Sequence, residues 1–138
     1  MSATRLNYFM ATYDILKEEQ VGFRKGMSTS NSTLKLLHAI KAGLNLKKST
    51  LAVFIDFQGA YDIICRKGLL NKLKKIGVKD KMLNWMKRYL TQRCVRVRWN
   101  NVESKYRLSN VGLPQGSFSS PSFLNIYVND LIKRLKKL

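Results

Sequence analysis

Two carboxylates on either side of a short turn are the side chains whose type and spacing first suggest chemistry in this sequence. Asp56 directly follows the apolar run from Leu51 to Ile55, and Asp62 comes six residues later, beyond a glycine-containing turn. A short apolar run bounded by turn signals predicts a buried strand. A carboxylate at the point where such a strand leaves the core can lie at a ligand-binding edge of a sheet. The residue types alone favour a simpler role, because Asp is also a common turn and helix-capping residue.

A second stretch combines bare backbone with a side-chain amide before a helix. Gly112 and Gly116 flank the dipeptide Pro114-Gln115. A helix with Pro121 in its first turn is predicted to follow and to run to about residue 134. A rigid loop of this kind can bring the amide of Gln115 and neighbouring N–H groups close to a ligand.

Two basic segments are candidates for phosphate contacts. Arg24 and Lys25 lie in a glycine-bracketed loop before a predicted helix, where cations and free N–H groups favour anions. Arg96 and Arg98 share one face of an alternating segment, which predicts a hairpin over residues 93–108 with an Asn-Asn turn. A plain loop and a solvated hairpin face explain the two segments equally well.

The elements that must hold these residues in place are mainly helices. Four further segments carry apolar residues at the spacing of an amphipathic helix. They are residues 3–11, residues 30–46, a segment marked by Leu69, Leu70 and Leu73, and a segment marked by Met82, Leu83, Met86 and Leu90.

Composition points to a polyanionic partner. The chain has 138 residues, enough for one domain with a core. It carries 26 Lys and Arg against 8 Asp and Glu, a net charge of +18. Such an excess favours nucleic acid first and an anionic membrane second. The basic residues occur in every segment, which suits a folded surface that follows a phosphate backbone.

Nothing in the sequence predicts membrane insertion or export. No apolar run approaches the length of a bilayer, and the N-terminus lacks the apolar core of a signal peptide. Cys65 and Cys94 form no metal or redox motif, so they are expected to be reduced core thiols. We therefore expect an intracellular protein, in the cytoplasm or nucleus, without membrane contacts; the sequence does not indicate its oligomeric state.

In their order along the chain, four segments resemble the motifs of reverse transcriptases from non-LTR (LINE-type, jockey/R1-like) retrotransposons. The resemblance implies an α/β (α+β) fold: a partial right-hand polymerase palm whose small mixed or antiparallel sheet is backed by helices, together with part of the fingers. The domain would cover residues 1–138, with fingers at about 1–50 and palm at about 51–138. The four segments are 19–29, 52–62, 69–77 together with 85–93, and 112–121 together with 125–131.

The resemblance also implies roles for single residues. Asp56 matches the catalytic, metal-binding carboxylate, and Phe57 offers a backbone carbonyl beside it. Tyr61 matches the aromatic residue beneath the incoming sugar, and Gln115 and Gly116 match the loop that touches the incoming nucleotide. The implied activity is nucleotidyl transfer with two Mg²⁺ ions, using an RNA template, a DNA primer and deoxynucleoside triphosphates. Arg24 and Lys25 are weaker carry-overs, as template or phosphate contacts. Arg96 and Arg98 stay weak candidates for phosphate contacts from the hairpin pattern alone.

One departure from the family pattern bears on activity. The second metal-binding motif, an aromatic-Ala-Asp-Asp turn, is missing, and the sequence has no Asp-Asp pair. Because one carboxylate cannot hold two metal ions, we expect a polymerase fragment, truncated before that motif, that is inactive by itself. The alternative is a non-catalytic, basic RNA- or DNA-binding module derived from a retroelement. Without the two strands that flank the missing Asp-Asp turn, the strand ending at Asp56 would lose its sheet partner and expose a hydrophobic edge.

Overall fold

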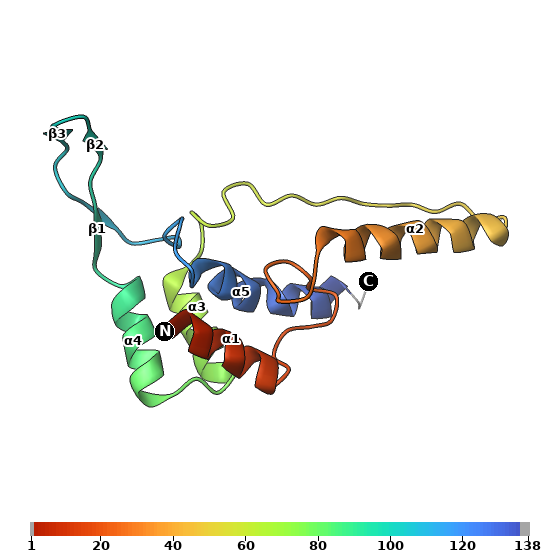
Figure 1. Ribbon diagram of the computed structural model, residues 1–138, viewed down its shortest axis with the longest axis horizontal. Helices are drawn as coiled ribbons and strands as arrows, with labels where there is room; N and C mark the ends of the chain where they lie inside the picture. The colour runs from red at the N-terminus through yellow and green to blue at the C-terminus, as the bar shows by residue number, and fades with distance from the viewer. Residues whose placement is uncertain (1, 136–138) are drawn as a thin grey trace.

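The computed structural model describes residues 2–135, which form a helical body with two projecting parts. Figure 1 shows α2 leaving this body on one side and the hairpin leaving it on the other. The mixture of helices with small antiparallel sheets agrees with the predicted α/β class. The helices are α1 (Ser2–Thr12), α2 (Thr29–Asn45), α3 (Arg66–Lys75), α4 (Asp80–Leu90) and α5 (Ser120–Leu135), and the strands are β1 (Arg93–Val95), β2 (Arg98–Trp99), β3 (Val102–Glu103) and β4 (Arg107–Ser109).

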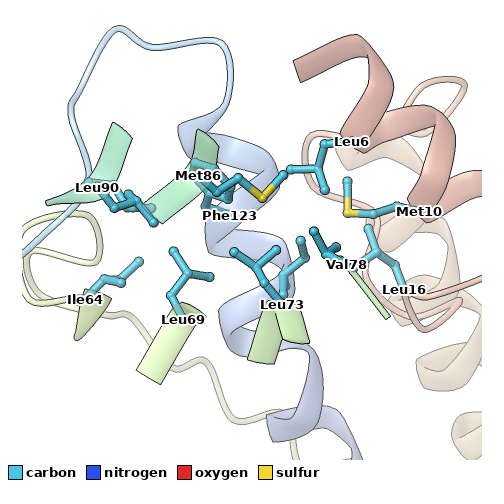
Figure 2. Packing of buried hydrophobic residues seen from close by; sticks show 12 residues of the cluster. Leu6, Met10, Leu16, Ile64, Leu69, Leu73, Val78, Met86, Leu90 and Phe123 are labelled. Atoms are coloured by element: carbon cyan, nitrogen blue, oxygen red, sulfur yellow. The ribbon is translucent and has the colours of Figure 1, made fainter. Parts of the chain in front are cut away.

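The hydrophobic core lies between α1, α3, α4 and α5. Phe123 of α5 is fully buried and packs among apolar side chains of the other three helices (Figure 2). Burying a side chain of this kind stabilises the fold by roughly 1.5–3 kcal/mol. The apolar faces predicted for α3 and α4 are confirmed, because Leu69 and Leu73 of α3 and Met86 and Leu90 of α4 are buried. The buried apolar residues are Leu6, Met10, Leu16, Ile64, Leu69, Leu73, Val78, Met86, Leu90, Leu113, Phe123 and Ile126.

The helix ends follow local sequence signals. Gly77 has a φ of +95° just after α3, a conformation that glycine adopts without steric cost. Pro121 lies in the first turn of α5, as predicted. The sulfur of Cys65 accepts a hydrogen bond of 3.4 Å from the N–H of Gly68 and caps α3. Both cysteines are free but exposed, so their predicted place in the core is wrong. Within the described residues, no helix is both long and apolar enough to cross a membrane.

The predicted hairpin is present but is interrupted. β1 pairs with β4 and β2 pairs with β3, both antiparallel, and Asn100 turns the chain with a φ of 51°. The return strand has one more residue than the outgoing strand between the two ladders, which is a β-bulge. The two ladders project from the body without a helical layer behind them (Figure 1), so the expected sheet backed by helices is not what these residues form.

α2 confirms the predicted helix at 30–46, but its apolar face is not buried. None of its described residues is buried, and Leu34, Leu37 and Leu44 are exposed. Figure 1 shows the chain returning from the far end of α2 to α3 as a long extended segment. The amphipathic pattern of α2 is therefore not matched by a packing partner among the described residues.

The prediction of a buried strand at residues 51–56 is wrong for this structure. The segment is extended but belongs to no sheet, and its apolar side chains lie in solvent. Leu51 is 89% exposed and Phe54 83%, values typical of an unpacked chain. The physical reason is that a strand needs a neighbour for its backbone hydrogen bonds, and within residues 2–135 none pairs with this segment. The expected exposure of apolar side chains is present, but on an extended segment and not at the edge of a sheet.

Candidate functional site

Three of the predicted nucleotide-binding residues line one pocket. Tyr61, Gln115 and Gly116 border a cavity of about 360 Å³ whose other walls come from Ser117 and from the start of α5. Tyr61 is separated from the other two by more than fifty residues of sequence, so folding brings them together. Burial raises the pKa of the Tyr61 phenol, which therefore stays a neutral hydroxyl near neutral pH. The remaining lining residues are Ser117, Ser120 and Pro121.

Backbone hydrogen bonds join the two sides of this pocket. The N–H of Leu113 donates to the carbonyl of Tyr61 at 2.7 Å, and the N–H of Gly112 donates to the carbonyl of Ile64 at 2.9 Å. Gly112 has a φ of +75°, and a Cβ built there would lie 2.7 Å from the carbonyl oxygen of Asp62. Only glycine allows this approach.

A side-chain contact links the two predicted motifs directly. The amide nitrogen of Gln115 donates to a carboxylate oxygen of Asp62 at 3.1 Å. Since the amide has its own acceptor, its carbonyl oxygen is left to accept from a ligand. Asp62 therefore orients the side chain that is predicted to touch the nucleotide.

Arg66 is the residue of this site that sequence reasoning missed. Its buried guanidinium donates four hydrogen bonds to the chain that leads into the pocket loop, residues 112–119 between β4 and α5. The acceptors are the carbonyl of Gly112 at 2.6 Å, the carbonyl of Val111 at 2.7 Å, and both the hydroxyl (3.0 Å) and the carbonyl of Ser109. Burial, and then the charge of Arg93, lower the pKa of Arg66, but a guanidinium remains charged in proteins.

One sequence signal could have identified Arg66. It opens α3, where a cation is unfavourable beside the positive end of the helix dipole. A basic residue in this position suggests a tertiary partner that outweighs the cost. Because the chain has 26 basic residues, the presence of an arginine at position 66 did not by itself indicate a structural role.

The far end of the pocket loop is fixed to two helices. The hydroxyl of Ser120 in α5 donates to the carbonyl of Pro114 at 2.6 Å. The phenol of Tyr89 in α4 donates to the hydroxyl of Ser117 at 2.5 Å. The loop is thus held by α4, by α5 and by Arg66 of α3, which gives the pocket a preformed wall.

The structure does not bring Asp56 to this pocket. Asp56 and Phe57 lie in the exposed segment, and neither lines the cavity beside Tyr61. Carboxylate and carbonyl oxygens suit Mg²⁺, but residues 2–135 contain no group of three or more His, Cys, Asp or Glu side chains that could hold a metal ion. The described residues alone therefore do not fit a two-metal centre.

The basic residues predicted before α2 differ in their roles. Arg24 donates to the carbonyls of Lys17 at 2.9 Å and Gln20 at 3.3 Å, so much of its hydrogen-bonding capacity serves its own loop. Lys25 is exposed. Both border a separate cavity of about 180 Å³ against α1, and neither lines the pocket of Tyr61.

The hairpin arginines differ as well. Arg96 forms an ion pair with Glu103 and lies 4.9 Å from the centre of the Tyr106 ring. Arg98 is exposed and lies directly across the ladder from Glu103, which is already bound to Arg96. Arg98 is therefore the freer of the two for contact with a phosphate.

Comparison with known proteins gives a consistent result. The family described as reverse transcriptase (RNA-dependent DNA polymerase) matches residues 1–138. The chain is 36% identical over 129 residues to a probable RNA-directed DNA polymerase from transposon BS of Drosophila melanogaster, which covers 94% of this chain and 14% of that protein. It is 28% identical over 129 residues to the corresponding X-element protein of the same species, with the same coverage.

A third relative extends the pattern to another element. The chain is 26% identical to the RNA-directed DNA polymerase from mobile element jockey of Drosophila melanogaster, over 91% of this chain and 14% of that protein. No solved structure matches. The chain thus spans about 14% of the length of these curated relatives. With its full length matched by the family, the chain belongs to the reverse transcriptases and is homologous to the RNA-directed DNA polymerases of non-LTR retrotransposons.

Proposed function

We propose that this chain is the nucleotide-holding part of an RNA-directed DNA polymerase, and that its pocket binds a deoxynucleoside triphosphate. The observation that carries the proposal is the cavity of about 360 Å³ lined by Tyr61, Gln115 and Gly116. These are the residues whose motifs suggested nucleotide contacts, and the relatives are named as polymerases of this class.

Each pocket residue has a distinct role in this proposal. The ring of Tyr61 lies beneath the sugar and leaves no room for a 2′-hydroxyl, which selects deoxynucleotides. Gln115, oriented by Asp62, contacts the nucleotide through its amide. A Cβ at Gly116 would meet no atom within 4 Å, so the backbone there borders open space that a ligand can approach.

Asp56, with the carbonyl of Phe57, would supply part of the ligand set of a Mg²⁺ ion. The palm would comprise about residues 51–138 and the fingers part about residues 1–50. The net charge of +18 supports an RNA template and a DNA primer as partners. The location that goes with these partners is the cytoplasm or the nucleus. Because the described residues do not complete a metal centre, this chain alone does not sustain synthesis.

Nucleotide binding by the purified chain tests the proposal. Saturation-transfer NMR should detect binding of dTTP and weaker binding of UTP, and Tyr61→Ala should reduce this preference. Tyr13→Ala is the matched control, because Tyr13 is 66% exposed and lies outside the pocket. Equal binding of both nucleotides that Tyr61→Ala does not change would contradict the proposed role of the ring.

Primer extension tests the inactivity. The chain with an RNA template, a DNA primer and Mg²⁺ should give no product above a blank. Synthesis by this chain alone that disappears in Asp56→Asn would contradict the claim.

The second candidate function is that of a non-catalytic RNA- or DNA-binding module. The charge of +18 favours it, because nucleic-acid binding needs only the basic surface. Binding of an oligonucleotide that weakens steeply with salt, without detectable binding of any nucleotide, would support this function over the first. Binding that does not change with salt would exclude it.

A further inference from the structure

The hairpin of residues 93–109 presents a row of exposed apolar side chains at its tip. Trp99 is 76% exposed, Val102 73% and Val97 70%. Trp99 and Val102 are directly opposite in the ladder and therefore share a face, and Val97 lies two residues earlier on the same side. Figure 1 shows that this tip points away from the helical body. No residue of the described chain covers the Trp99 ring enough to bury it.

The charge of the hairpin narrows the choice of partner. Residues 93–109 contain five Arg or Lys and one Glu, a balance of +4. The one carboxylate, Glu103, is bound by Arg96. Within residues 2–135, no carboxylate forms an ion pair with Arg98, Lys105 or Arg107, and all three are exposed. The hairpin therefore joins an open aromatic ring to unpaired cations.

This combination fits single-stranded nucleic acid. Surfaces that bind single strands combine cations for the backbone with aromatic rings on which bases stack. A duplex hides the faces of its bases inside the helix, so a projecting ring has nothing to stack on except at an end. A second copy of this hairpin is disfavoured as the occupant because each hairpin carries a charge balance of +4.

We propose that the hairpin is a docking site for single-stranded nucleic acid, in which Trp99 stacks on an unpaired base while Arg98 and Arg107 contact neighbouring phosphates. Arg98 precedes Trp99 in the strand and lies on the opposite face of the ribbon, so its long side chain contacts a phosphate around the ribbon's edge. Arg107 lies opposite Val95 in the other ladder. The site shares no residue with the pocket of Tyr61, so it does not depend on nucleotide binding or polymerase activity. A failure of one proposal therefore leaves the other intact.

The sequence provides its own probe for this site. The chain has two tryptophans, and Trp85 stacks on Tyr89 in α4 with ring centres 5.2 Å apart. A Trp85→Phe background leaves Trp99 as the single emitter. Titration with a single-stranded oligouridylate at low salt should quench this emission, whereas a blunt duplex with the same number of phosphates should quench it far less.

Substitutions then separate stacking from charge. Trp99→Leu keeps an apolar side chain but should weaken binding of a labelled oligouridylate by roughly 5- to 150-fold, the range for loss of one stacked base. Tyr8→Leu is the matched control, since Tyr8 is a 73% exposed aromatic residue on α1, and it should leave affinity unchanged. Arg98→Gln and Arg107→Gln should each reduce the slope of log affinity against log salt by about 0.7.

Two results would overturn the proposal. One is an oligonucleotide that binds, by anisotropy, without changing Trp99 emission. The other is a Trp99→Leu chain that binds as tightly as the parent. Either would place the nucleic acid elsewhere and leave the apolar row for a protein partner. Unchanged far-ultraviolet circular dichroism of Trp99→Leu would show that the helical body is intact, as expected for a side chain outside the core.

Discussion

Asp56 and Tyr61 belong to one motif and lie five residues apart, yet their surroundings differ sharply. The chain at Tyr61 is fixed by backbone bonds to the pocket loop, and that loop is held by Arg66. The chain before Asp56 has no sheet partner within residues 2–135 and exposes its apolar side chains. The difference teaches that two residues of one short segment can draw their order from different parts of a protein. Here the pocket of Tyr61 is supported within the described chain, and the segment of Asp56 is not.

The largest expected effect comes from removing Arg66. Arg66→Leu leaves several backbone carbonyls without donors, so the free energy of unfolding should fall by about 3–5 kcal/mol. Asp56→Asn, on the other side of the comparison, should change it by less than about 0.5 kcal/mol. Urea unfolding followed by circular dichroism measures both. Similar losses from both substitutions would remove the contrast between the two regions.

A smaller loss of stability is expected where Gly112 lies against the backbone of Tyr61 and Asp62. Gly112→Ala places a methyl group 2.7 Å from the carbonyl of Asp62 at a φ of +75°, so it should cost on the order of 2 kcal/mol or more. Gly116→Ala has a similar φ of +78° but no atom within 4 Å, so it should cost only about 1 kcal/mol. Equal costs in thermal unfolding would mean that the close approach is absent.

The ion pair between Lys72 of α3 and Asp130 of α5 should make a small, pH-dependent contribution to the stability of the helical body. A hydrogen bond from Lys72 at 2.6 Å lowers the pKa of Asp130 below its ordinary value of 3.8. A lowered carboxyl pKa means that the contribution is complete above pH 3.8 and disappears as pH falls through the folded-state value. Asp130 is 58% exposed, so the contribution should not exceed about 1 kcal/mol.

Asp130→Asn isolates this contribution. The stabilities of the variant and the parent should differ most near neutral pH and converge as the pH drops below 3.8. Urea unfolding at a series of pH values gives the comparison. A difference that grows as pH falls would have the wrong sign for this ion pair.

The smallest effect on stability is expected in the exposed segment. Phe54→Ser should change the free energy of unfolding by less than about 0.5 kcal/mol, because Phe54 is 83% exposed. It should nevertheless lower self-association of the chain roughly several-fold, because the segment of residues 51–57 is apolar, extended and unpaired. Light scattering against concentration measures this, with Phe23→Ser as the control at a 69% exposed position outside the segment. Equal reductions would show that the segment is not special.

Sequence patterns predicted the features that depend on the local spacing of residues, namely the apolar faces of the helices and the turn of the hairpin. The apolar faces around Leu69, Met86 and Phe123 and the Asn-Asn turn of the hairpin are all present. Tyr61, Gln115 and Gly116, which the motifs assigned to the same ligand, line one pocket, and their contact with a nucleotide stays a prediction.

What the sequence did not predict depends on distant partners. The run before Asp56 has the composition of a buried strand, but burial requires a neighbouring strand that residues 2–135 do not provide. The role of Arg66 depends on carbonyls more than forty residues away, which no local pattern can reveal. The expected helical backing of the sheet failed because the hairpin projects from the body (Figure 1).

Hydrogen exchange of single amides, measured by NMR on dilute monomer, tests the contrast between the two regions most directly. The amides of Gly112 and Leu113 donate to the carbonyls of Ile64 and Tyr61, so they should be protected nearly as well as the helical core. The amides of residues 51–57 should exchange at rates close to those of an unstructured peptide. Strong protection of residues 51–57, or none at Gly112 and Leu113, would contradict the account.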